Sequence, residues 1–408
     1  MTDHVIERLG HKGDGITGDG LRVALTLPGE VVSGAPENGR ITDPRIVAPS
    51  PDRVRAPCAH FRSCGGCALQ HASDDFVARW KAQVVETALA AQGIVAPFRP
   101  IHTSPPRTRR RATLAGRRTK KGALVGFHAR RSDTIVPITE CHVLHPDLLA
   151  LVPVLEEVTR LGASRNAVLA FALTRSEAGV DCAVTGGKPL DEALRLALPR
   201  FVPHFARLTW GDETVFTASP PAQRFGLAQV IPPPGAFLQA TPDGEAALVS
   251  AMQEAVGEAR HVADLFAGCG TFTLPLAQAA AVHAVEGAAD LTEALDHATR
   301  HATGLKPITL ETRDLFRRPL LPDELTRFDA VLLDPPRAGA EAQVAQIAEA
   351  GVPRIAYVSC NPVTFARDAK ALCDAGYRID WVQVVDQFRW SPHVELAAQI
   401  SRAHISAA

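Results

Sequence analysis

Residues 264–273 read Asp-Leu-Phe-Ala-Gly-Cys-Gly-Thr-Phe-Thr. They begin with an acid at the end of an apolar run, continue with a Gly-x-Gly turn and lead into an Ala- and Leu-rich segment. This order predicts a buried strand, a tight turn whose glycines let the backbone approach a ligand closely, and a helix. A Gly-x-Gly turn is also common as a plain connection between two elements, so its meaning depends on the segments around it.

On both sides of this stretch, from residue 236 onward, strand-like and helix-like segments alternate. Apolar runs predict strands at 261–267, 282–286, 308–311, 328–333, 354–359, 380–386 and 394–401. Ala- and Leu-rich segments predict helices at 272–281, 288–303, 340–350 and 363–376. Strict alternation of the two kinds predicts an α/β fold, in which helices cover both faces of a mostly parallel sheet.

The residues around the turn indicate which class of ligand it could bind. Position 273 is Thr instead of a third glycine, and no Lys follows the turn, which disfavours a dinucleotide and a triphosphate. The next strand ends in Val285-Glu286-Gly287, so Glu286 stands 22 residues after Asp264. An acid at this place can accept hydrogen bonds from ribose hydroxyls. An adenosyl ligand without a pyrophosphate fits both observations. These residues therefore favour S-adenosylmethionine over NAD and over a sheet that binds no ligand.

Two later strand ends carry groups that could react beside such a ligand. Asp334-Pro335-Pro336 follows the run at 328–333, and its two prolines make a rigid turn that projects the Asp334 carboxylate into the crevice. Cys360 follows the run at 354–359 and precedes a predicted helix, whose N-terminal dipole would lower the pKa of the thiol. The alternatives are a purely structural turn and a buried, inert cysteine. The position of both groups over one crevice favours the reactive interpretation.

A third candidate group lies near the C-terminus. In Pro392-His393-Val394-Glu395, the His and Glu side chains alternate along an extended segment and share one face. Glu395 is either a surface acid or, if it lines the crevice, a general base.

A thiol and a carboxylate beside a methyl donor are the groups needed to methylate C5 of uracil. A thiolate that adds to C6 makes C5 nucleophilic, C5 takes the methyl group, the base removes the C5 proton, and the thiolate leaves. A methyltransferase that acts on an exocyclic nitrogen has no need of Cys360. The three candidate groups therefore predict this chemistry.

The composition is that of an ordinary globular protein, with 46% apolar and 21% charged residues. No run of about 18 uninterrupted apolar residues occurs, and charged residues are spread through the first twenty positions. We therefore expect a cytoplasmic protein. The net charge of −1 hides a basic segment, because residues 99–131 hold eleven Lys or Arg and no Asp or Glu. Such a segment is either a solvated face or, as its density favours, a phosphate-binding surface.

The 408 residues are long enough for more than one domain. Residues 1–48 contain several glycines and short apolar runs, which predict a small β module. Residues 49–235 predict a central α+β domain that holds the basic segment, and this region closes on Pro232-Pro233-Pro234-Gly235, which no regular element crosses. Residues 236–408 hold the alternating strands and helices.

Three segments carry a resemblance to the RNA uracil-C5 methyltransferase family, which makes 5-methyluridine in transfer and ribosomal RNA. They are Tyr357 through Asp368, Asp334-Pro335-Pro336-Arg337-Ala338-Gly339, and Phe237-Leu238-Gln239. The resemblance covers about residues 50–402. It implies a Rossmann-like class I methyltransferase domain and RNA as the partner. It also implies that the β module is a degenerate form of the oligonucleotide-binding barrel of many members, for which residues 1–48 are short.

The resemblance implies roles for individual residues as well. Cys360 would be the nucleophile, and Glu395 would be the base that removes the proton. The S-adenosylmethionine pocket would be lined by Gln239, Phe266, Thr271, Glu286, Asp314 and Asp334, of which Gln239 and Asp314 are indicated by the resemblance alone. The sequence departs from the family at Thr271, where Asn is common. It departs again at Arg389-Trp390, where a Pro usually follows the Phe, so we expect a different local backbone there.

The cysteines form one local group. Cys58, Cys64 and Cys67 fall within ten residues, and Cys141 could complete a set of four. Four thiolates suit tetrahedral zinc or an iron–sulfur cluster. Radical enzymes that use the same methyl donor carry three, not five, residues between their first two thiols, which disfavours that mechanism. Ribosomal RNA members of the family bind a [4Fe-4S] cluster at matching positions, so the resemblance implies one here, with a structural or RNA-contacting role. Cys182, Cys269 and Cys373 are expected to be structural.

The main hypothesis is methylation of a uridine C5 in RNA, and the cysteine set favours ribosomal RNA. We expect a monomer that contacts no membrane. The alternatives are transfer RNA as the substrate, cytosine C5 methylation, and a cluster-bearing RNA-binding protein without catalysis. Cytosine enzymes place their nucleophile in other motifs, which disfavours the second. The presence of Cys360, Glu395, Asp334 and Glu286 disfavours the third.

Overall fold

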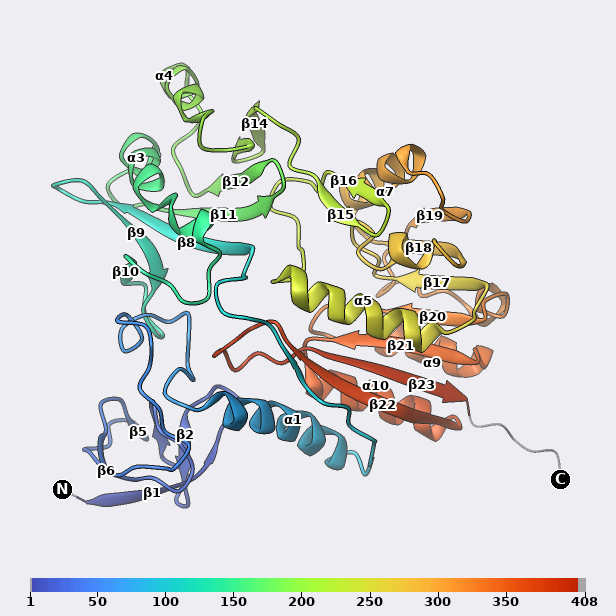
Figure 1. Cartoon of the computed structure of the whole chain (residues 1–408), viewed down its shortest axis with the longest axis horizontal. Coiled ribbons are helices and arrows are strands. Elements are labelled where there is room, and N and C mark those ends of the chain that lie inside the picture. The colour runs from blue at the N-terminus through green and yellow to red at the C-terminus, as the bar shows by residue number, and fades with distance from the viewer. Residues whose placement is uncertain (1, 403–408) are drawn as a thin grey trace.

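The computed structural model describes residues 2–402, which form three main sheets (Figure 1). The first is a six-stranded N-terminal sheet in the order β5-β3-β2-β1-β4-β6. Its strands are β1 (Asp3–Leu9), β2 (Gly15–Thr17), β3 (Arg22–Val23), β4 (Val31–Ser33), β5 (Arg40–Ile41) and β6 (Arg45–Ala48). A small core of Ile6, Val23, Val32 and Ile41 lies inside it. The short strands predicted for residues 1–48 are thus confirmed.

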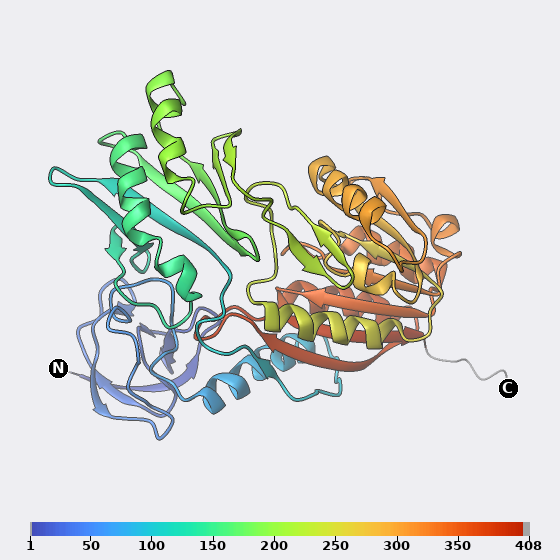
Figure 2. The same ribbon diagram turned by 45° about the horizontal axis from the view of Figure 1, so that its top comes forward.

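The second sheet has seven strands in the order β10-β9-β8-β11-β12-β13-β14. Its strands are β8 (Arg111–Arg118), β9 (Ala123–His128), β10 (Ile135–Pro137), β11 (Val168–Ser176), β12 (Gly179–Thr185), β13 (Arg207–Trp210) and β14 (Glu213–Thr217). The helical segments of this region are α2 (Pro146–Leu149), α3 (Val152–Gly162), α4 (Glu192–Ala197) and the 3-10 helix η1 (Leu198–Phe201). Leu114, Leu155 and Phe171 belong to the apolar core that joins α3 to the sheet. Figure 2 shows this middle sheet above the N-terminal sheet.

The third sheet contains the predicted alternating region and has the order β19-β18-β17-β20-β21-β23-β22-β7. Its strands are β17 (His261–Leu265), β18 (Ala281–Glu286), β19 (Ile308–Thr312), β20 (Ala330–Leu333), β21 (Arg354–Ser359), β22 (Tyr377–Asp386), β23 (Leu396–Arg402) and β7 (His102–Thr103). The strands from β19 to β21 are parallel, and β23 runs antiparallel to both neighbours. The seven predicted strands and the mostly parallel arrangement are confirmed.

Helices cover both faces of this sheet, as predicted. The helices are α5 (Pro242–Val256), α6 (Thr273–Leu276), α7 (Ala289–His301), α8 (Pro322–Leu325), α9 (Glu341–Ala350), α10 (Pro362–Asp374) and α1 (Asp74–Ala90). Helices α5 and α6 share a core with Leu332 and Val358, whereas α1, α9 and α10 share the opposite core with Leu333 and Tyr357. All four residues of β20 are buried because both faces are covered. Helix α6 ends at Leu276, earlier than the predicted 281, because β18 already begins at Ala281.

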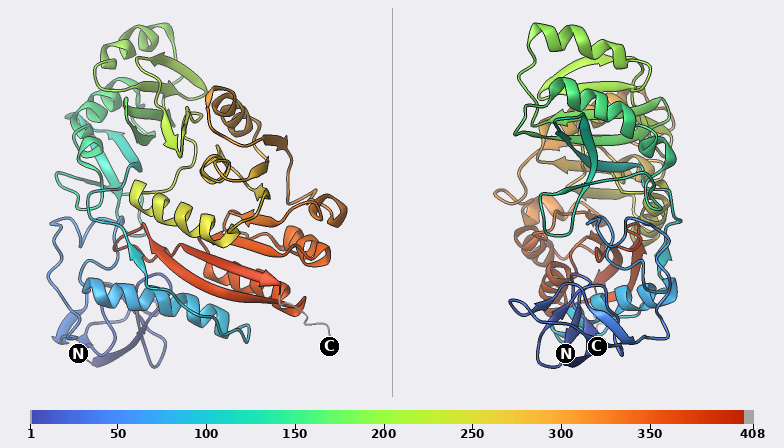
Figure 3. Two further views of the ribbon diagram at one scale, coloured as in Figure 1. Left: turned by 45° about the vertical axis from the view of Figure 1, so that its right-hand side comes forward. Right: turned by 90° about the vertical axis from the view of Figure 1, so that its left-hand side faces the viewer.

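Helix α1 and strand β7 precede the predicted boundary at residue 235, but both contact the third sheet. Helix α1 packs against α10 and β22, and β7 pairs in parallel with the end of β22 (Figures 1 and 3). The hairpin of β15 (Gln223–Phe225) and β16 (Ala228–Val230) packs against α7. The predicted divisions at residues 48 and 235 stay a prediction, and residues 403–408 lie outside the described part. None of the helices within residues 2–402 has the length and apolar character to span a membrane.

Candidate active site

A cavity of about 760 Å³ opens at the carboxyl ends of the parallel strands and is closed on its other side by the middle sheet. It is lined by all eight side chains that were predicted to bind the cofactor or to react: Gln239, Phe266, Thr271, Glu286, Asp314, Asp334, Cys360 and Glu395. Gln239 lies before α5, and Glu286 is the last residue of β18. Phe266, Thr271, Asp314 and Asp334 follow strands β17, β19 and β20, Cys360 follows β21, and Glu395 precedes β23. The fold thus brings together residues that are up to 156 positions apart in the sequence.

The Gly-x-Gly turn is held against the next strand by backbone hydrogen bonds. The N–H groups of Phe266 and Ala267 donate to the carbonyl oxygen of Val285 at 3.0 and 3.1 Å. Gly268 and Gly270 have φ angles of 57° and 94°, which L side chains rarely adopt. A Cβ at position 270 would also lie only 2.5 Å from a methyl carbon of Leu295. The glycines are therefore needed for both the backbone angle and the packing of the turn.

Glu286 organises this turn while its side chain lines the cavity. One carboxylate oxygen accepts from the Gly268 N–H and the other from the Ala288 N–H, both at 2.9 Å. On the next loop, Asp314 accepts from the Phe316 N–H at 3.0 Å and from the Arg317 N–H at 3.3 Å. Both acids thus have fixed orientations. Their predicted contacts with a cofactor stay predictions.

The cavity and its floor concentrate carboxyl groups. Asp264 is fully buried, and burial raises the pKa of its carboxyl to about 7. Its Oδ2 accepts from the Thr273 hydroxyl at 2.6 Å, while Oδ1 has no partner within residues 2–402. Burial, and then the nearby charges of Asp264 and Glu286, raise the pKa of Asp334 to about 7. A cationic ligand would stabilise the ionised form of these carboxyls, so the donor set suits a sulfonium.

Cys360 lies between β21 and α10, as predicted, but the prediction that its thiol pKa is lowered is wrong. Burial raises the pKa of the thiol, and the charges of Glu395 and Asp334 raise it further. The charge of Arg337 acts in the opposite direction and is outweighed. The helix N-terminus is occupied by Asn361, whose side chain accepts from the Val363 N–H at 3.2 Å. The N-terminus of α10 therefore does not outweigh burial and the two acidic neighbours in setting the pKa of this thiol.

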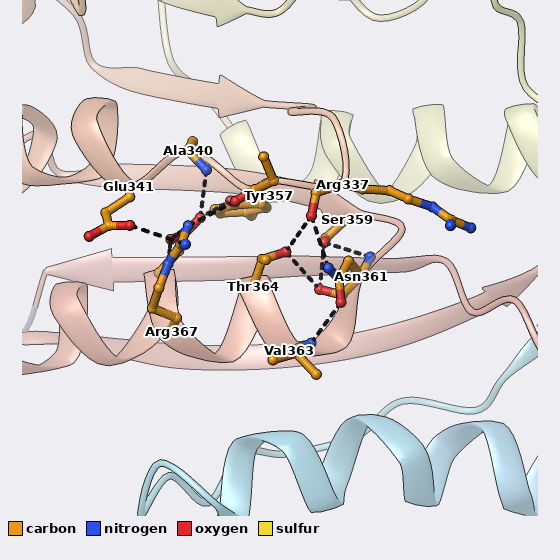
Figure 4. Close-up of polar contacts among 11 residues, drawn as sticks. Arg337, Ala340, Glu341, Tyr357, Ser359, Asn361, Val363, Thr364 and Arg367 are labelled. Carbon is orange, nitrogen blue, oxygen red and sulfur yellow. Dashed lines mark hydrogen bonds and ion pairs between the residues drawn. The ribbon is translucent and has the colours of Figure 1, made fainter. Parts of the chain in front are cut away.

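The Asp334 loop and the Cys360 loop are tied to each other by hydrogen bonds (Figure 4). The carbonyl oxygen of Arg337 accepts from the Asn361 amide at 2.9 Å and from the Thr364 hydroxyl at 3.2 Å. These contacts fix the distance between the loop that carries Asp334 and the helix that follows Cys360.

A buried carboxylate completes this connection. Asp368 accepts from the Tyr357 hydroxyl at 2.6 Å, from the Ala340 N–H at 2.7 Å and from the guanidinium of Arg367 (Figure 4). A Cβ at Gly339 would come within 2.7 Å of both Arg367 and Asp368, and its φ is 77°. The segment from Tyr357 to Asp368 thus contains the structural support of the loop as well as Cys360, whose role as a nucleophile stays a prediction.

Glu395 is 3% exposed and lies in the cavity wall with His393, so the predicted shared face is confirmed. Burial raises the pKa of Glu395 to about 8, and the charge of Asp334 contributes to the rise. His393 contacts the Arg337 guanidinium at 2.8 Å. The difference from the family that was expected in the backbone at Arg389-Trp390 stays a prediction. Trp390 has a φ of 58°, and its carbonyl oxygen accepts from the N–H groups of Ala68 and Leu69.

Part of the basic segment turns inward, which sequence reasoning missed. Arg110 is buried and forms an ion pair with Glu245, so it does not contribute to an RNA-binding surface. Arg109 and Arg111 line the cavity. The guanidinium of Arg111 donates to the Leu238 carbonyl oxygen at 3.0 Å. The three arginines are consecutive in the extended segment that leads into β8, where neighbouring side chains point to opposite sides, and this alternation explains the split. The cavity is also lined by Phe237, Arg337 and Phe388, to which no individual role was assigned from the sequence.

The four cysteines of the predicted set are free and partly exposed. Burial raises the pKa values of Cys58, Cys64 and Cys67, the last to about 12, and the charge of Cys141 raises each of them as well. In residues 2–402, no group of three or more His, Cys, Asp or Glu side chains is arranged to hold a metal ion. The thiols are near enough to influence each other's ionisation, and the predicted cluster is not confirmed by the arrangement of the described side chains.

An α/β sheet with an acidic cavity at its carboxyl edge fits the class of S-adenosylmethionine-dependent methyltransferases, and comparison with known proteins assigns the chain to it. A family model described as tRNA (Uracil-5-)-methyltransferase matches residues 235–403. An uncharacterized RNA methyltransferase of Brucella suis biovar 1 is 44% identical, over 97% of each chain. The 23S rRNA (uracil(1939)-C(5))-methyltransferase RlmD of Thiobacillus denitrificans is 35% identical, over 88% of each chain.

A solved structure extends the likeness to the whole fold. The tRNA (uracil-54, C5)-methyltransferase of Pyrococcus abyssi, in complex with S-adenosyl-L-homocysteine, superposes with a TM-score of 0.76 and 25% sequence identity. The match covers 98% of this chain and 99% of that one. The chain therefore belongs to the RNA (uracil-5-)-methyltransferase family. It is an RNA methyltransferase that uses S-adenosylmethionine, as the sequence predicted.

Proposed function

We propose that this enzyme transfers a methyl group to C5 of a specific uridine in ribosomal RNA through a covalent bond between Cys360 and C6 of the ring. The observation that carries the proposal is the meeting of Cys360, Asp334 and Glu395 in one cavity, where their charges influence each other's ionisation. The similarity to the Thiobacillus denitrificans ribosomal RNA enzyme supports the choice of RNA.

S-adenosylmethionine supplies an electrophilic methyl group on a positively charged sulfur. In the proposed pocket, Phe266 and Phe316, whose ring centroids are 5.4 Å apart, offer an aromatic wall beside Glu286 and Asp314. Gln239, Thr271 and Asp334 complete the set of residues that would hold this ligand. The positive sulfur would lower the pKa values of Asp334 and Cys360, because opposite charge favours the ionised form. Binding of the methyl donor therefore prepares the thiol for attack.

The reaction itself uses two side chains of this chain. The Cys360 thiolate adds to C6, and the electron pair of the C5–C6 bond moves toward the C4 carbonyl oxygen. C5 then attacks the methyl carbon of the donor, the bond from that carbon to the sulfonium sulfur breaks, and neutral S-adenosylhomocysteine leaves. The Glu395 carboxylate removes the proton from C5, the C5–C6 double bond forms again, and the bond from C6 to sulfur breaks. Each group is regenerated once Glu395 releases its proton to solvent.

The target base must leave its stack to reach Cys360, since the thiol lies inside a cavity. Arg109 and Arg111 line the same cavity, and no Asp or Glu forms an ion pair with either in the described chain. We propose that they bind phosphates beside the flipped nucleotide. Exposed Arg107, Arg118 and Lys120 would extend this contact to neighbouring phosphates.

The identity of the methylated nucleoside tests the proposal. RNA incubated with the enzyme and isotopically labelled S-adenosylmethionine is expected to yield labelled 5-methyluridine after digestion to nucleosides. Separate reactions with ribosomal and transfer RNA fragments identify the preferred RNA. Labelled 5-methylcytidine as the only product would contradict the proposed base, and a preference for transfer RNA would contradict the proposed RNA.

We also propose that Cys58, Cys64, Cys67 and Cys141 bind a [4Fe-4S] cluster. Two observations support this proposal. All four thiols are free, and the sulfurs of Cys64 and Cys141 accept hydrogen bonds from backbone N–H groups at 3.3 and 3.4 Å. Arg130 contacts the carbonyl oxygens of Phe61 and Cys67, which shapes the loop. The cluster would support the fold or the RNA contact, because methyl transfer requires no electron.

Protein purified without oxygen is expected to hold about four iron and four sulfide ions per chain, with the broad visible absorbance of such clusters. Cys67→Ser should lose most of this iron. Cys373→Ser is the matched control, because Cys373 lies on α10 outside the set and should leave the iron content unchanged. Zinc in place of iron, or wild-type protein without metal after anaerobic purification and reconstitution, would contradict the proposal.

A further inference from the structure

Gln387 lies directly after β22 and is 1% exposed. Its side chain makes three polar contacts with residues that belong to the active site or adjoin it. The amide oxygen Oε1 accepts from the Ala240 N–H at 2.6 Å. The amide nitrogen Nε2 lies 2.5 Å from Gln239 Oε1 and 3.4 Å from Glu395 Oε2. One buried amide thus joins the segment before α5 to the proposed base.

The backbone contact fixes the orientation of this amide. An N–H group can only donate, so the atom that faces Ala240 must be the oxygen of Gln387. The NH₂ end of Gln387 must then face Gln239 and Glu395, and it donates to both. Gln239 consequently points its oxygen toward Gln387 and its own NH₂ group away from it. Gln239 lines the cavity, so the cavity wall offers a hydrogen-bond donor at this place.

From these contacts we infer that Gln387 is a positioning residue of the active site, which orients the Glu395 carboxylate and determines that Gln239 presents its NH₂ end to the cavity. The inference rests on the proposed function. A donor in this wall suits an acceptor atom of the S-adenosylmethionine that Gln239 is proposed to help hold. Gln387 itself lines no part of the cavity, so it acts through the two residues that it holds.

Three groups influence the ionisation of Glu395 besides its burial. Asp334, from the loop after β20, raises the pKa of the carboxyl, whereas the Gln387 hydrogen bond and the charge of Arg337 lower it. Cys360, after β21, also faces this carboxyl, and the charge of Glu395 raises the pKa of the Cys360 thiol. Removal of the Gln387 donor therefore raises the pKa of Glu395 further. Because Glu395 acts as a base only when it is deprotonated, activity should then require a higher pH.

The test compares Gln387→Met, which keeps the volume but neither donates nor accepts strongly, with Gln343→Met as the matched control. Gln343 is also 1% exposed, and its amide bonds both backbone groups of Leu320, away from the cavity. In Gln387→Met, the rise of kcat/KM with pH should move upward by about half a pH unit, and kcat at pH 7 should fall by about tenfold. Gln343→Met should leave the position of the profile unchanged, even if its stability is lower.

A second variant and a second measurement make the result decisive. Gln387→Glu keeps an acceptor for the Ala240 N–H but replaces the donor by a like charge, so the profile should move further upward than in Gln387→Met. The pKa of Glu395 is also read directly from its ¹³C carboxyl chemical shift, assigned with Glu395→Gln, in protein without RNA. This titration does not depend on which nucleoside the enzyme makes. An unchanged pKa in both folded Gln387 variants would overturn the inference while leaving the proposed reaction untouched.

Discussion

Cys360→Ala is expected to reduce methyl transfer to uridine-containing RNA by about four orders of magnitude or more, while S-adenosylmethionine still binds. Loss of a covalent nucleophile has effects of this size, because the remaining groups cannot activate C5. The thiol is only partly buried and makes no ion pair, so the fold should survive the change. Initial rates with labelled methyl donor give the loss in activity, and calorimetric titration gives the affinity for the donor. Residual activity within about tenfold of wild type would contradict the role of Cys360.

The covalent intermediate can be trapped in two independent ways. With 5-fluorouridine at the target position, the reaction stops after methyl transfer, since no proton is present on C5, and the protein should stay bound to the RNA through Cys360. In Glu395→Gln the same arrest is expected with ordinary uridine, because the base can no longer remove the proton. Mass spectrometry of the digested complex locates the bond. A bond to any of the other seven cysteines would exclude the proposed mechanism.

Lys81→Met should cost about 3–5 kcal/mol of the free energy of unfolding, which is the usual cost of leaving a buried charge without its partner. Lys81 lies on α1 and is fully buried, and its Nζ is 2.5 Å from Asp386 Oδ1. The same Nζ lies 3.2 Å from the Phe388 carbonyl oxygen. The contact therefore fixes the start of the loop that leads through Gln387 to Glu395. Denaturation in urea, followed by circular dichroism, gives the change in stability.

Two further variants separate the effect of the buried charge from that of the lost side chain. Lys370→Met removes an exposed pair with Asp374 on α10 and should cost less than about 1 kcal/mol. In the double variant Lys81→Met with Asp386→Asn, neither charge remains, so its loss should be smaller than the sum of the two single losses. Equal losses for Lys81→Met and Lys370→Met would show that the buried pair contributes no more than a surface pair.

The third sheet could be predicted well from the sequence, because each of its strands is marked by an apolar run of adjacent residues. An apolar run such as 330–333 identifies a buried strand without knowledge of its neighbours, and the residue after the run is then placed at the carboxyl edge of the sheet. This rule placed Asp334 and Cys360 in one cavity. It could not predict the ionisation of the thiol, because the pKa of Cys360 depends on its burial and on the charges of Glu395 and Asp334, all of which are set by the tertiary fold.

The features that were missed depend on contacts between distant segments. From the sequence alone, Lys81 would be expected on the solvated side of a helix. Its burial is explained by the ion pair with Asp386. The sequence predicts that the basic segment forms one surface, whereas Arg110 is buried in an ion pair with Glu245. The two-residue strand β7 is too short to leave a pattern of its own. Each of these positions is determined by a partner that local periodicity does not reveal.

The contact between α1 and the C-terminal sheet has a consequence for biosynthesis. Lys81 and Asp386 are separated by 305 residues, and β7 pairs with the same distant strand. A nascent chain therefore exposes the apolar side of α1, including Val85 and Leu89, until β22 has left the ribosome. Long-range closure of this kind slows folding and prolongs the exposure of apolar surface. Residues 377–386 must emerge before the first helix reaches its place against the sheet, so this part of the core forms late in synthesis.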